Sequence, residues 1–260
     1  MNAALISSAG LLAGASSAAA TSASAGGLAW MAGAVVLATV ATALVLRPWR
    51  LLHGAAPPWP WLAWCAALPW LWSADRLSAV PAVQPLPGAC LLLLMAGWPL
   101  ATLAFVPAAA ATAWLAQLSL AEALERLLWL GTLPAGMALA LGAAVRRWLP
   151  RHLFVYILAR GFVVTVLANM AAGTAQALAQ PVPGGLSLED LLLARWLAGW
   201  GDAVITGMIV AVFVAFRPQW LATYADHLYL PPATSRNDHR SAAAPAPSPP
   251  TPDPPRGEAP

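Results

Sequence analysis

The chain has 260 residues, of which 60% are hydrophobic and only 9% are charged, and its mean hydropathy is +0.69. Soluble domains are about 45–50% apolar and about 25% charged. Charge this sparse excludes a soluble enzyme, a nucleic-acid-binding protein and a disordered regulator. Because apolar runs of about 20 residues recur along the chain, we expect an all-α polytopic membrane protein.

The few charges carry topological information. The formal net charge is +3, no lysine occurs, and the arginines stand mainly at the ends of apolar runs. Arginines in such positions mark the cytoplasmic side of a membrane rather than a nucleic-acid surface. Cys65 and Cys90 lie inside apolar segments, and we interpret them as small buried hydrophobes in preference to a disulfide or metal ligands.

The N-terminal third contains the least regular spans. Residues 1–27 are rich in Ala, Ser and Gly and carry no charge, which predicts an N-terminal extension, either poorly ordered or forming a weak extra helix. A first span is expected over 28–46, ended by Arg47 and Arg50. Five tryptophans in 59–74 indicate a second, Pro-bent interfacial segment.

The stretch 86–117 is too long for one span. As one helix it would be about 48 Å long, against a hydrocarbon core of about 30 Å. Gly97-Trp98-Pro99 near its middle predicts two short spans joined by a tight turn. Further spans are expected over 127–145, 152–178 and 190–216.

The arginine positions predict how these spans are oriented. About seven spans (range six to eight) within 28–218, with the N-terminus outside and the C-terminus cytoplasmic, put every arginine cluster on one side. Residues 219–230 predict an interfacial amphipathic segment, and the Pro-rich residues 231–260 predict a disordered cytoplasmic tail.

Polar groups recur at helical spacing only in the last two spans. Small and polar residues four apart occur at Gly161, Thr165, Asn169 and Gly173, and again at Gly199, Ala203, Gly207 and Ala211. Small residues at this spacing let two helices approach closely in lipid. We therefore expect these two spans to pack against each other, with Gly161, Gly173, Gly199 and Gly207 at the contact.

Asp202 is an ionisable residue at membrane depth, where charge costs about 2.5–3.5 kcal/mol. Counting about 1.5 Å per residue from the cytoplasmic ends places Asp202 about 21 Å deep, level with Thr165 and Asn169. Thr206 lies one helical turn from Asp202. One interpretation is a substrate pathway reached from outside, formed by Asp202, Asn169, Thr165 and Thr206. The other is an interhelical hydrogen-bond clamp without a ligand.

Other chemistry is scarce. His152 at the cytoplasmic start of a span, and Trp220 and Tyr224 after the last span, are candidates for docking a partner, or else interfacial anchors. No metal-ligand spacing, phosphate-binding loop or nucleophile motif occurs, so we predict neither an enzyme nor a cofactor. Transport driven by ATP would need a separate ATPase subunit.

Two segments resemble a known family. Leu149-Pro150-Arg151-His152-Leu153-Phe154-Val155-Tyr156-Ile157 with Gly161-Phe162, and Asp202-Ala203-Val204-Ile205-Thr206-Gly207 with Phe216-Arg217-Pro218, look like blocks of bacterial energy-coupling factor ABC transporter permeases. These proteins are related to the cobalt/nickel uptake permeases. The Trp98-Pro99-Leu100 turn is similar as well, and the resemblance is clearest over 148–230.

The resemblance implies a permease or substrate-specificity component of the bacterial inner membrane, working with a transmembrane coupling subunit and ATPase subunits. Asp202 stands where the family has Glu. Met1-Asn2 stands where metal-uptake members have Met-His, and no His occurs around Gln84, so metal ligation is not carried over. The substrate is then a transition-metal ion or another small solute. The alternative is a non-transporting membrane scaffold or assembly protein that uses the same helix packing.

Overall fold

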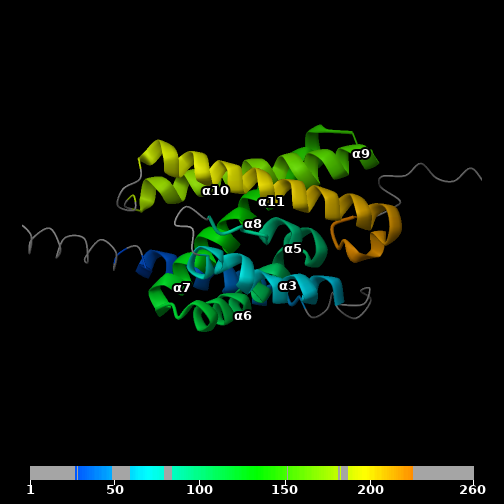
Figure 1. Cartoon of the computed structure of the whole chain (residues 1–260). Coiled ribbons are helices and arrows are strands. Elements are labelled where there is room, and N and C mark those ends of the chain that lie inside the picture. The colour runs from blue at the N-terminus through cyan, green and yellow to red at the C-terminus, as the bar shows by residue number, and fades with distance from the viewer. Residues whose placement is uncertain are drawn as a thin grey trace, which may run out of the picture.

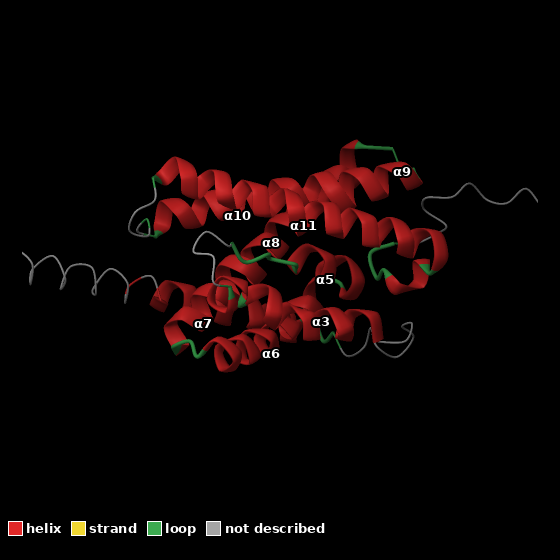
Figure 2. Cartoon of the chain, in the orientation of Figure 1, coloured by secondary structure: helices red, strands yellow, loops and turns green. Residues whose placement is uncertain are grey.

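The structure is a computed structural model and describes residues 27, 29–48, 59–78, 84–150, 152–180, 182 and 187–224. Every regular element within these ranges is helical (Figure 2). The predicted extension before residue 27, the tail over 231–260, and Arg50 and Arg151 lie outside the described residues.

In chain order the elements are Ala29–Val45, α3 Trp59–Trp72, α4 Ala74–Leu77, α5 Ala89–Ala96, α6 Trp98–Ala116, α7 Leu120–Arg126, the π-helix η1 Leu127–Thr132, α8 Leu133–Trp148, α9 Leu153–Val155, the π-helix η2 Tyr156–Val163, α10 Val164–Ala179, α11 Leu188–Phe216 and the 3-10 helix η3 Pro218–Trp220.

Four helices of the described chain are long and apolar enough to cross a membrane. They are Trp98–Ala116, Leu120–Trp148, Leu153–Ala179 and Leu188–Phe216. The expectation of an all-helical chain with membrane-spanning helices is confirmed at this level. Ala29–Val45 and α3 are apolar but shorter.

Capping sets where two of the long helices begin. Ser119 accepts a hydrogen bond from the Glu122 amide while the Glu122 side chain accepts from the Ser119 amide, and Ser187 and Asp190 form the same reciprocal pair. Such capping boxes satisfy amides that have no partner within the helix. They fix where α7 and α11 begin.

The predicted break in 86–117 is present at Gly97, but the first half differs from a span. Gly97 has φ +78°, where only glycine is comfortable, and it separates α5 from α6. Because α5 has eight residues, it is about 12 Å long and cannot cross a core of about 30 Å. The expectation of two short spans is therefore wrong for α5, which lies inside the bundle.

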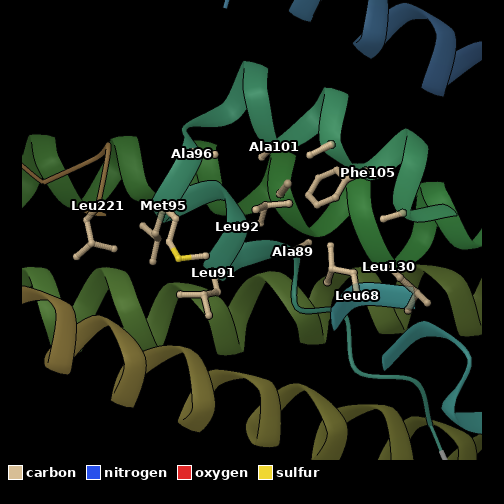
Figure 3. Close-up of a cluster of buried hydrophobic side chains, with 14 of the residues drawn as sticks. Leu68, Ala89, Leu91, Leu92, Met95, Ala96, Ala101, Phe105, Leu130 and Leu221 are labelled. Atoms are coloured by element: carbon tan, nitrogen blue, oxygen red, sulfur yellow. The ribbon is translucent and has the colours of Figure 1, made fainter. Parts of the chain in front are cut away.

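The largest hydrophobic cluster surrounds α5. All eight residues of this helix are buried. Figure 3 shows Leu91, Leu92 and Met95 at the middle of the cluster, with Leu221 at one end and Leu68 at the other. An apolar helix buried on every side has no polar face to show to water, which explains why its sequence reads as a continuous apolar run.

The segment after α11 also differs from the prediction. Residues 218–224 form η3 and a turn rather than an amphipathic helix on the membrane surface, and Leu221 and Tyr224 are buried. The Ala222 and Thr223 amides donate to the carbonyls of Met95 and Leu94, respectively. These bonds satisfy carbonyls at the end of α5 that have no partner within a helix. The remainder of the predicted segment, 225–230, lies outside the described residues.

The long helices run side by side, and the bundle has two distinct ends. α10 packs along α11 and α3 packs along α6, with α5 between the two pairs (Figure 1). The start of α7, the end of α10 and the start of α11 share one end, which we call the α7 end. The ends of α8 and α11, with Arg146, Arg147 and Arg217, share the other end, which we call the arginine end.

Candidate functional site

A cavity of about 420 Å³ occupies the α7 end of the bundle. Its wall comes from segments far apart in sequence: α4, the loop before α5, the α7–η1 helix, α10 and α11. Asn169, Gly173, Gln176 and Gln180 of α10 line it in succession, so it extends along about 16 Å of that helix. Pockets for small ligands commonly have volumes of about 300–1,000 Å³.

Two ion pairs stand in the outer wall of the cavity. Arg126 binds Asp75 through both guanidinium nitrogens, at 2.8 and 2.6 Å, and also donates to the Trp72 carbonyl. Arg76 binds the Glu122 carboxylate at 2.7 Å, with both side chains about half exposed. These four charges neutralise one another in pairs, and the pairs connect α4 to the α7–η1 helix.

Two further charged side chains in the wall have no charged partner within salt-bridge distance among the described residues. Glu125 accepts a hydrogen bond from Gln180 Nε2 at 2.7 Å. Arg195 reaches only the Gly173 carbonyl, at 3.4 Å, and its Nε is buried without a hydrogen-bond partner. The cavity therefore contains one guanidinium whose charge and donors are mostly unused.

The deep end of the cavity contains the pair that the sequence singled out. Asn169 lines the cavity, and its Nδ2 donates to Asp202 Oδ2 at 2.7 Å. The other carboxylate oxygen of Asp202 accepts from the Gly88 amide at 3.1 Å, and Asp202 is only 1% exposed. Because Gly88 immediately precedes α5, the carboxylate lies at the amino-terminal end of this buried helix, where the helix dipole favours negative charge.

Two indole groups also donate hydrogen bonds to the loop before α5. Trp64 Nε1 donates to the Gly88 carbonyl at 2.8 Å, and Trp72 Nε1 donates to the Pro87 carbonyl at 2.7 Å. Asp202 and the two indoles thus fix both the amide and the carbonyls of this loop. The loop residues Gln84, Pro85 and Pro87 in turn line the cavity.

Thr165 and Thr206, the remaining pathway candidates, are buried but do not line this cavity. Thr165 Oγ1 donates to the Gly161 carbonyl of its own helix at 2.9 Å. Thr206 Oγ1 is buried and has no hydrogen-bond partner. The structure therefore brings Asn169 and Asp202 together, and it places neither threonine in hydrogen-bond contact with them.

The four glycines expected at helix contacts lie where η2 and α10 meet α11. A Cβ at Gly161 would lie 3.2 Å from Val210, and one at Gly207 would lie 3.4 Å from the Cβ of Phe162. A Cβ at Gly199 would lie 3.2 Å from the Cβ of Asn169, so this glycine lets Asn169 approach α11. Gly173 gives the same room to Arg195, at 3.3 Å.

The three docking candidates have different surroundings. His152 is exposed, and its Nδ1 accepts from the Phe154 amide at 3.4 Å, which caps α9. Trp220 is half-buried with its ring edge-on to Phe213. Tyr224 is buried against the ring of Tyr156, with ring centroids 4.9 Å apart, so the expectation that it offers a docking surface is wrong.

Neither cysteine forms a disulfide, and Cys90 is buried near Asn169, with Sγ 3.9 Å from Oδ1. Among the described residues, no three His, Cys, Asp or Glu side chains gather closely enough to hold a metal ion. The donors at the deep end of the cavity are an amide and a shielded carboxyl, which are poor ligands for a transition metal. The arrangement is suited instead to hydrogen bonding and to pairing with an anion.

Sequence reasoning missed most of the cavity wall. The residues not anticipated are Asp75, Arg76, Glu122, Glu125, Arg126 and Arg195. The signal was present, because in a chain with so few charges these residues stand at the ends of apolar runs away from the arginine clusters. Arg160 lies apart from this wall: it is buried under the ring of Tyr156 and donates to the Thr223 carbonyl at 3.4 Å.

Comparisons with known proteins identify no relative. No protein-family model matches the chain, and no curated protein and no solved structure is significantly similar to it.

Proposed function

We propose that this protein is a multi-pass membrane component of an uptake transporter that binds a small solute in the cavity at the α7 end. The observation that carries the proposal is the cavity itself: about 420 Å³ of space, lined by charged and amide side chains, inside an otherwise apolar helical bundle. Polar side chains in such a setting are costly and usually serve a pathway or a binding site.

The positions of the arginines support an outward-facing cavity. Arg146, Arg147 and Arg217 stand at the arginine end, opposite the cavity, and form no ion pair among the described residues. At the cavity end, by contrast, Arg76 and Arg126 are paired with carboxylates, which leaves Arg195 as the unpaired arginine of the described lining. By the positive-inside rule, the arginine end lies in the cytoplasm and the cavity faces the outside of a bacterial inner membrane. In the proposed arrangement of about seven passes, the N-terminus is outside and the C-terminus is cytoplasmic. Because α5 is only a buried half-helix, the pass that contains it is completed by the loop before it.

The dependence on partner subunits rests on the resemblance of 149–162 and 202–218 to energy-coupling factor permeases. The chain carries no phosphate-binding loop, so a transmembrane coupling subunit and ATPase subunits would supply the energy. The substrate is a small solute, either an organic compound or a transition-metal ion brought in with its own ligands.

Cysteine labelling tests the direction that the cavity faces. In a Cys65→Ala, Cys90→Ala background, spheroplasts carrying Ala198→Cys are treated with a membrane-impermeant cationic methanethiosulfonate. Ala198 lines the cavity, whereas its neighbour Leu197 is exposed on the outer surface of α11 and serves as the matched lipid-facing control. Trp148→Cys, at the end of α8, reports the opposite side.

We expect Ala198→Cys to be labelled in intact spheroplasts, Leu197→Cys to stay unlabelled, and Trp148→Cys to be labelled only after permeabilisation. Labelling of Trp148→Cys but not of Ala198→Cys in intact spheroplasts would show that the cavity faces the cytoplasm and would contradict uptake. Affinity purification from native membranes tests the partners, because a transporter component should bring with it magnesium-dependent ATPase activity.

One observation favours the second candidate, a non-transporting membrane scaffold. Both carboxylate oxygens of Asp202 have protein donors, so a clamp between α10, α11 and α5 accounts for this residue without a ligand. A scaffold would purify with other membrane complexes and without ATPase activity. It would also leave the Ala198→Cys thiol without any ligand that protects it from labelling.

A further inference from the structure

We infer that the cavity binds a small organic solute carrying one carboxylate group, and that the guanidinium of Arg195 holds that carboxylate. This inference rests on the proposed function, because it names the substrate class of the same cavity. It uses three observations: the charge balance of the wall, the burial and bonding of Arg195, and the volume of the cavity.

The charge balance leaves Arg195 as the cation available to a ligand. Among the described lining residues the other two arginines are already committed, Arg126 to Asp75 and Arg76 to Glu122. Arg195 has no carboxylate within 4.0 Å in the described chain, and its one hydrogen bond is long at 3.4 Å. A guanidinium has five N–H donors in a planar fork that matches a carboxylate.

Arg195 is held in place without being neutralised. The stem of its side chain packs on Gly173, where a Cβ would lie 3.3 Å from the Cβ of Arg195. The buried Nε without an acceptor is costly, since a buried donor loses its hydrogen bonds with water. Because Nε is enclosed by protein, the donors open to a ligand are those of the two terminal nitrogens, and among the described residues only Nη1 has an acceptor, the Gly173 carbonyl at 3.4 Å.

The size and the remaining donors of the cavity favour an organic acid over a simple inorganic anion. About 420 Å³ is far more than one oxyanion fills. Gln84, Gln176 and Asn169 line the same space and offer amides to hydroxyl or carbonyl groups. One free guanidinium matches one negative charge, whereas Glu125 in the same wall would repel a second one.

The experiment uses the full chain in phosphatidylcholine nanodiscs and measures Tm at constant ionic strength. The probes are acetate, butyrate and 3-hydroxybutyrate, with acetamide and butyramide as uncharged controls of the same shape. We expect at least one carboxylate to raise Tm saturably and neither amide to do so. Absence of saturable stabilisation by all three carboxylates overturns the inference.

Variants then test the role of Arg195. Arg195→Gln should weaken carboxylate binding by at least tenfold, and Arg195→Lys should weaken it less while keeping the preference for anions. Arg146→Gln, which removes an exposed charge from the arginine end, is the matched control and should leave binding unchanged. Equal carboxylate affinity in Arg195→Gln and wild type overturns the assignment.

A second substitution keeps the test valid if Arg195→Gln does not fold. Ala198 lines the cavity one helical turn from Arg195, at the i, i+3 position where a carboxylate can pair with a guanidinium. Ala198→Asp should therefore satisfy Arg195 internally and abolish carboxylate binding, whereas Ala198→Asn should keep it. Binding that survives in Ala198→Asp contradicts the inference.

Two further outcomes separate this inference from its rivals. Saturable stabilisation by Co²⁺ or Ni²⁺ that persists in Arg195→Gln would mean that the cavity serves a metal ion. A native mass spectrum showing an anionic lipid bound to wild type but not to Arg195→Gln would assign the guanidinium to a lipid headgroup. If Ala198→Cys is labelled from outside but no carboxylate binds, only the ligand class fails; if it is not labelled, the proposed function fails.

Discussion

The two ends of α5 are fixed in opposite ways. At the amino-terminal end, the Gly88 amide and carbonyl are bound by side chains, from Asp202 and Trp64. At the carboxyl-terminal end, the carbonyls of Leu94 and Met95 accept backbone amides from residues 222 and 223. A side-chain contact changes with one substitution or with protonation, whereas a backbone contact persists through most substitutions. The amino-terminal end of α5, which side chains hold in place, is the end that lies beside the cavity.

This difference indicates which part of the bundle a ligand is able to influence. Asn169 lines the cavity and also binds Asp202, so a group that competes for the Asn169 amide would weaken the hold on the start of α5. Among the described residues, no side chain of the cavity wall contacts the other end, where Thr223 and Tyr156 are bonded to each other at 2.8 Å. The predictions below compare the two ends, beginning with the largest effect.

The largest effect is expected for Asp202→Ala. It leaves the Gly88 amide and the Asn169 amide group buried without acceptors, and two such groups should lower the free energy of unfolding by about 3 kcal/mol. Asp202→Asn is the matched control, because it keeps an acceptor for Gly88, and it should lower the free energy by only about 1 kcal/mol. Reversible unfolding in mixed detergent micelles measures both.

A loss in Asp202→Asn as large as that in Asp202→Ala would show that the charge, rather than the hydrogen bonds, holds the start of α5. If Asp202→Ala had the stability of wild type, the hydrogen bonds of Asp202 would not stabilise the start of α5. In either case the contrast between the two ends of α5 would need another cause.

The glycines that flank α5 give the next comparison. Gly88 (φ +62°) and Gly97 (φ +78°) both have backbone conformations that strain an L-residue, so alanine at either position should cost about 2 kcal/mol. Only at Gly88 does a Cβ also meet a neighbour, Leu68 Cδ2 at 2.8 Å.

Leu68→Val, which removes that methyl group, should therefore reduce the loss in free energy of unfolding caused by Gly88→Ala by about 0.5–1 kcal/mol. It should not change the loss caused by Gly97→Ala. A double-mutant cycle in the same micelles measures the coupling. Additive losses in both cycles would contradict the close packing at the start of α5.

Much of the fold was predictable from sequence because its cause is local. The apolar runs and the break at Gly97 are properties of a few neighbouring residues. The serine caps of α7 and α11 are equally local, but they were not anticipated, and the predicted spans began later than the helices do. The burial of α5 inside the protein was not predictable, since an eight-residue apolar helix has the same composition whether it contacts lipid or protein. The two π-helices, η1 and η2, were likewise not anticipated, because they shift the helical register without a mark in composition.

The site was predictable in part, for a similar reason. Asn169 and Asp202 were paired by counting residues along two helices that run antiparallel, and the structure shows them 2.7 Å apart. Arg195 and the α7–η1 wall were missed because the cavity joins segments that only tertiary packing brings together. Tyr224 was misplaced because an aromatic pattern fits both a membrane surface and a chain that turns back into the core.

At the other end of α5, Thr223→Val should have a smaller effect. It removes the hydroxyl that donates to the Leu94 carbonyl at 3.1 Å and lies 2.8 Å from the Tyr156 hydroxyl, while the Thr223 amide keeps its bond to the same carbonyl. We expect a loss of about 1 kcal/mol, measured in the same unfolding assay. A loss as large as that of Asp202→Ala would mean that side chains dominate at both ends.

The smallest effect, and one of opposite sign, is expected for Thr206→Val. Thr206 lies on α11 one turn from Asp202, and its hydroxyl is buried without a partner, whereas Asp202 uses both of its oxygens. Valine has the same shape without the polar atom, so the substitution should leave stability unchanged or raise it by up to about 1 kcal/mol. A measurable loss would show that the hydroxyl has a partner in the membrane, such as a water or a solute beside Asp202, and would return Thr206 to the substrate pathway. Together, Asp202→Ala and Thr206→Val separate a polar residue that holds α5 in place from one that the bundle merely encloses.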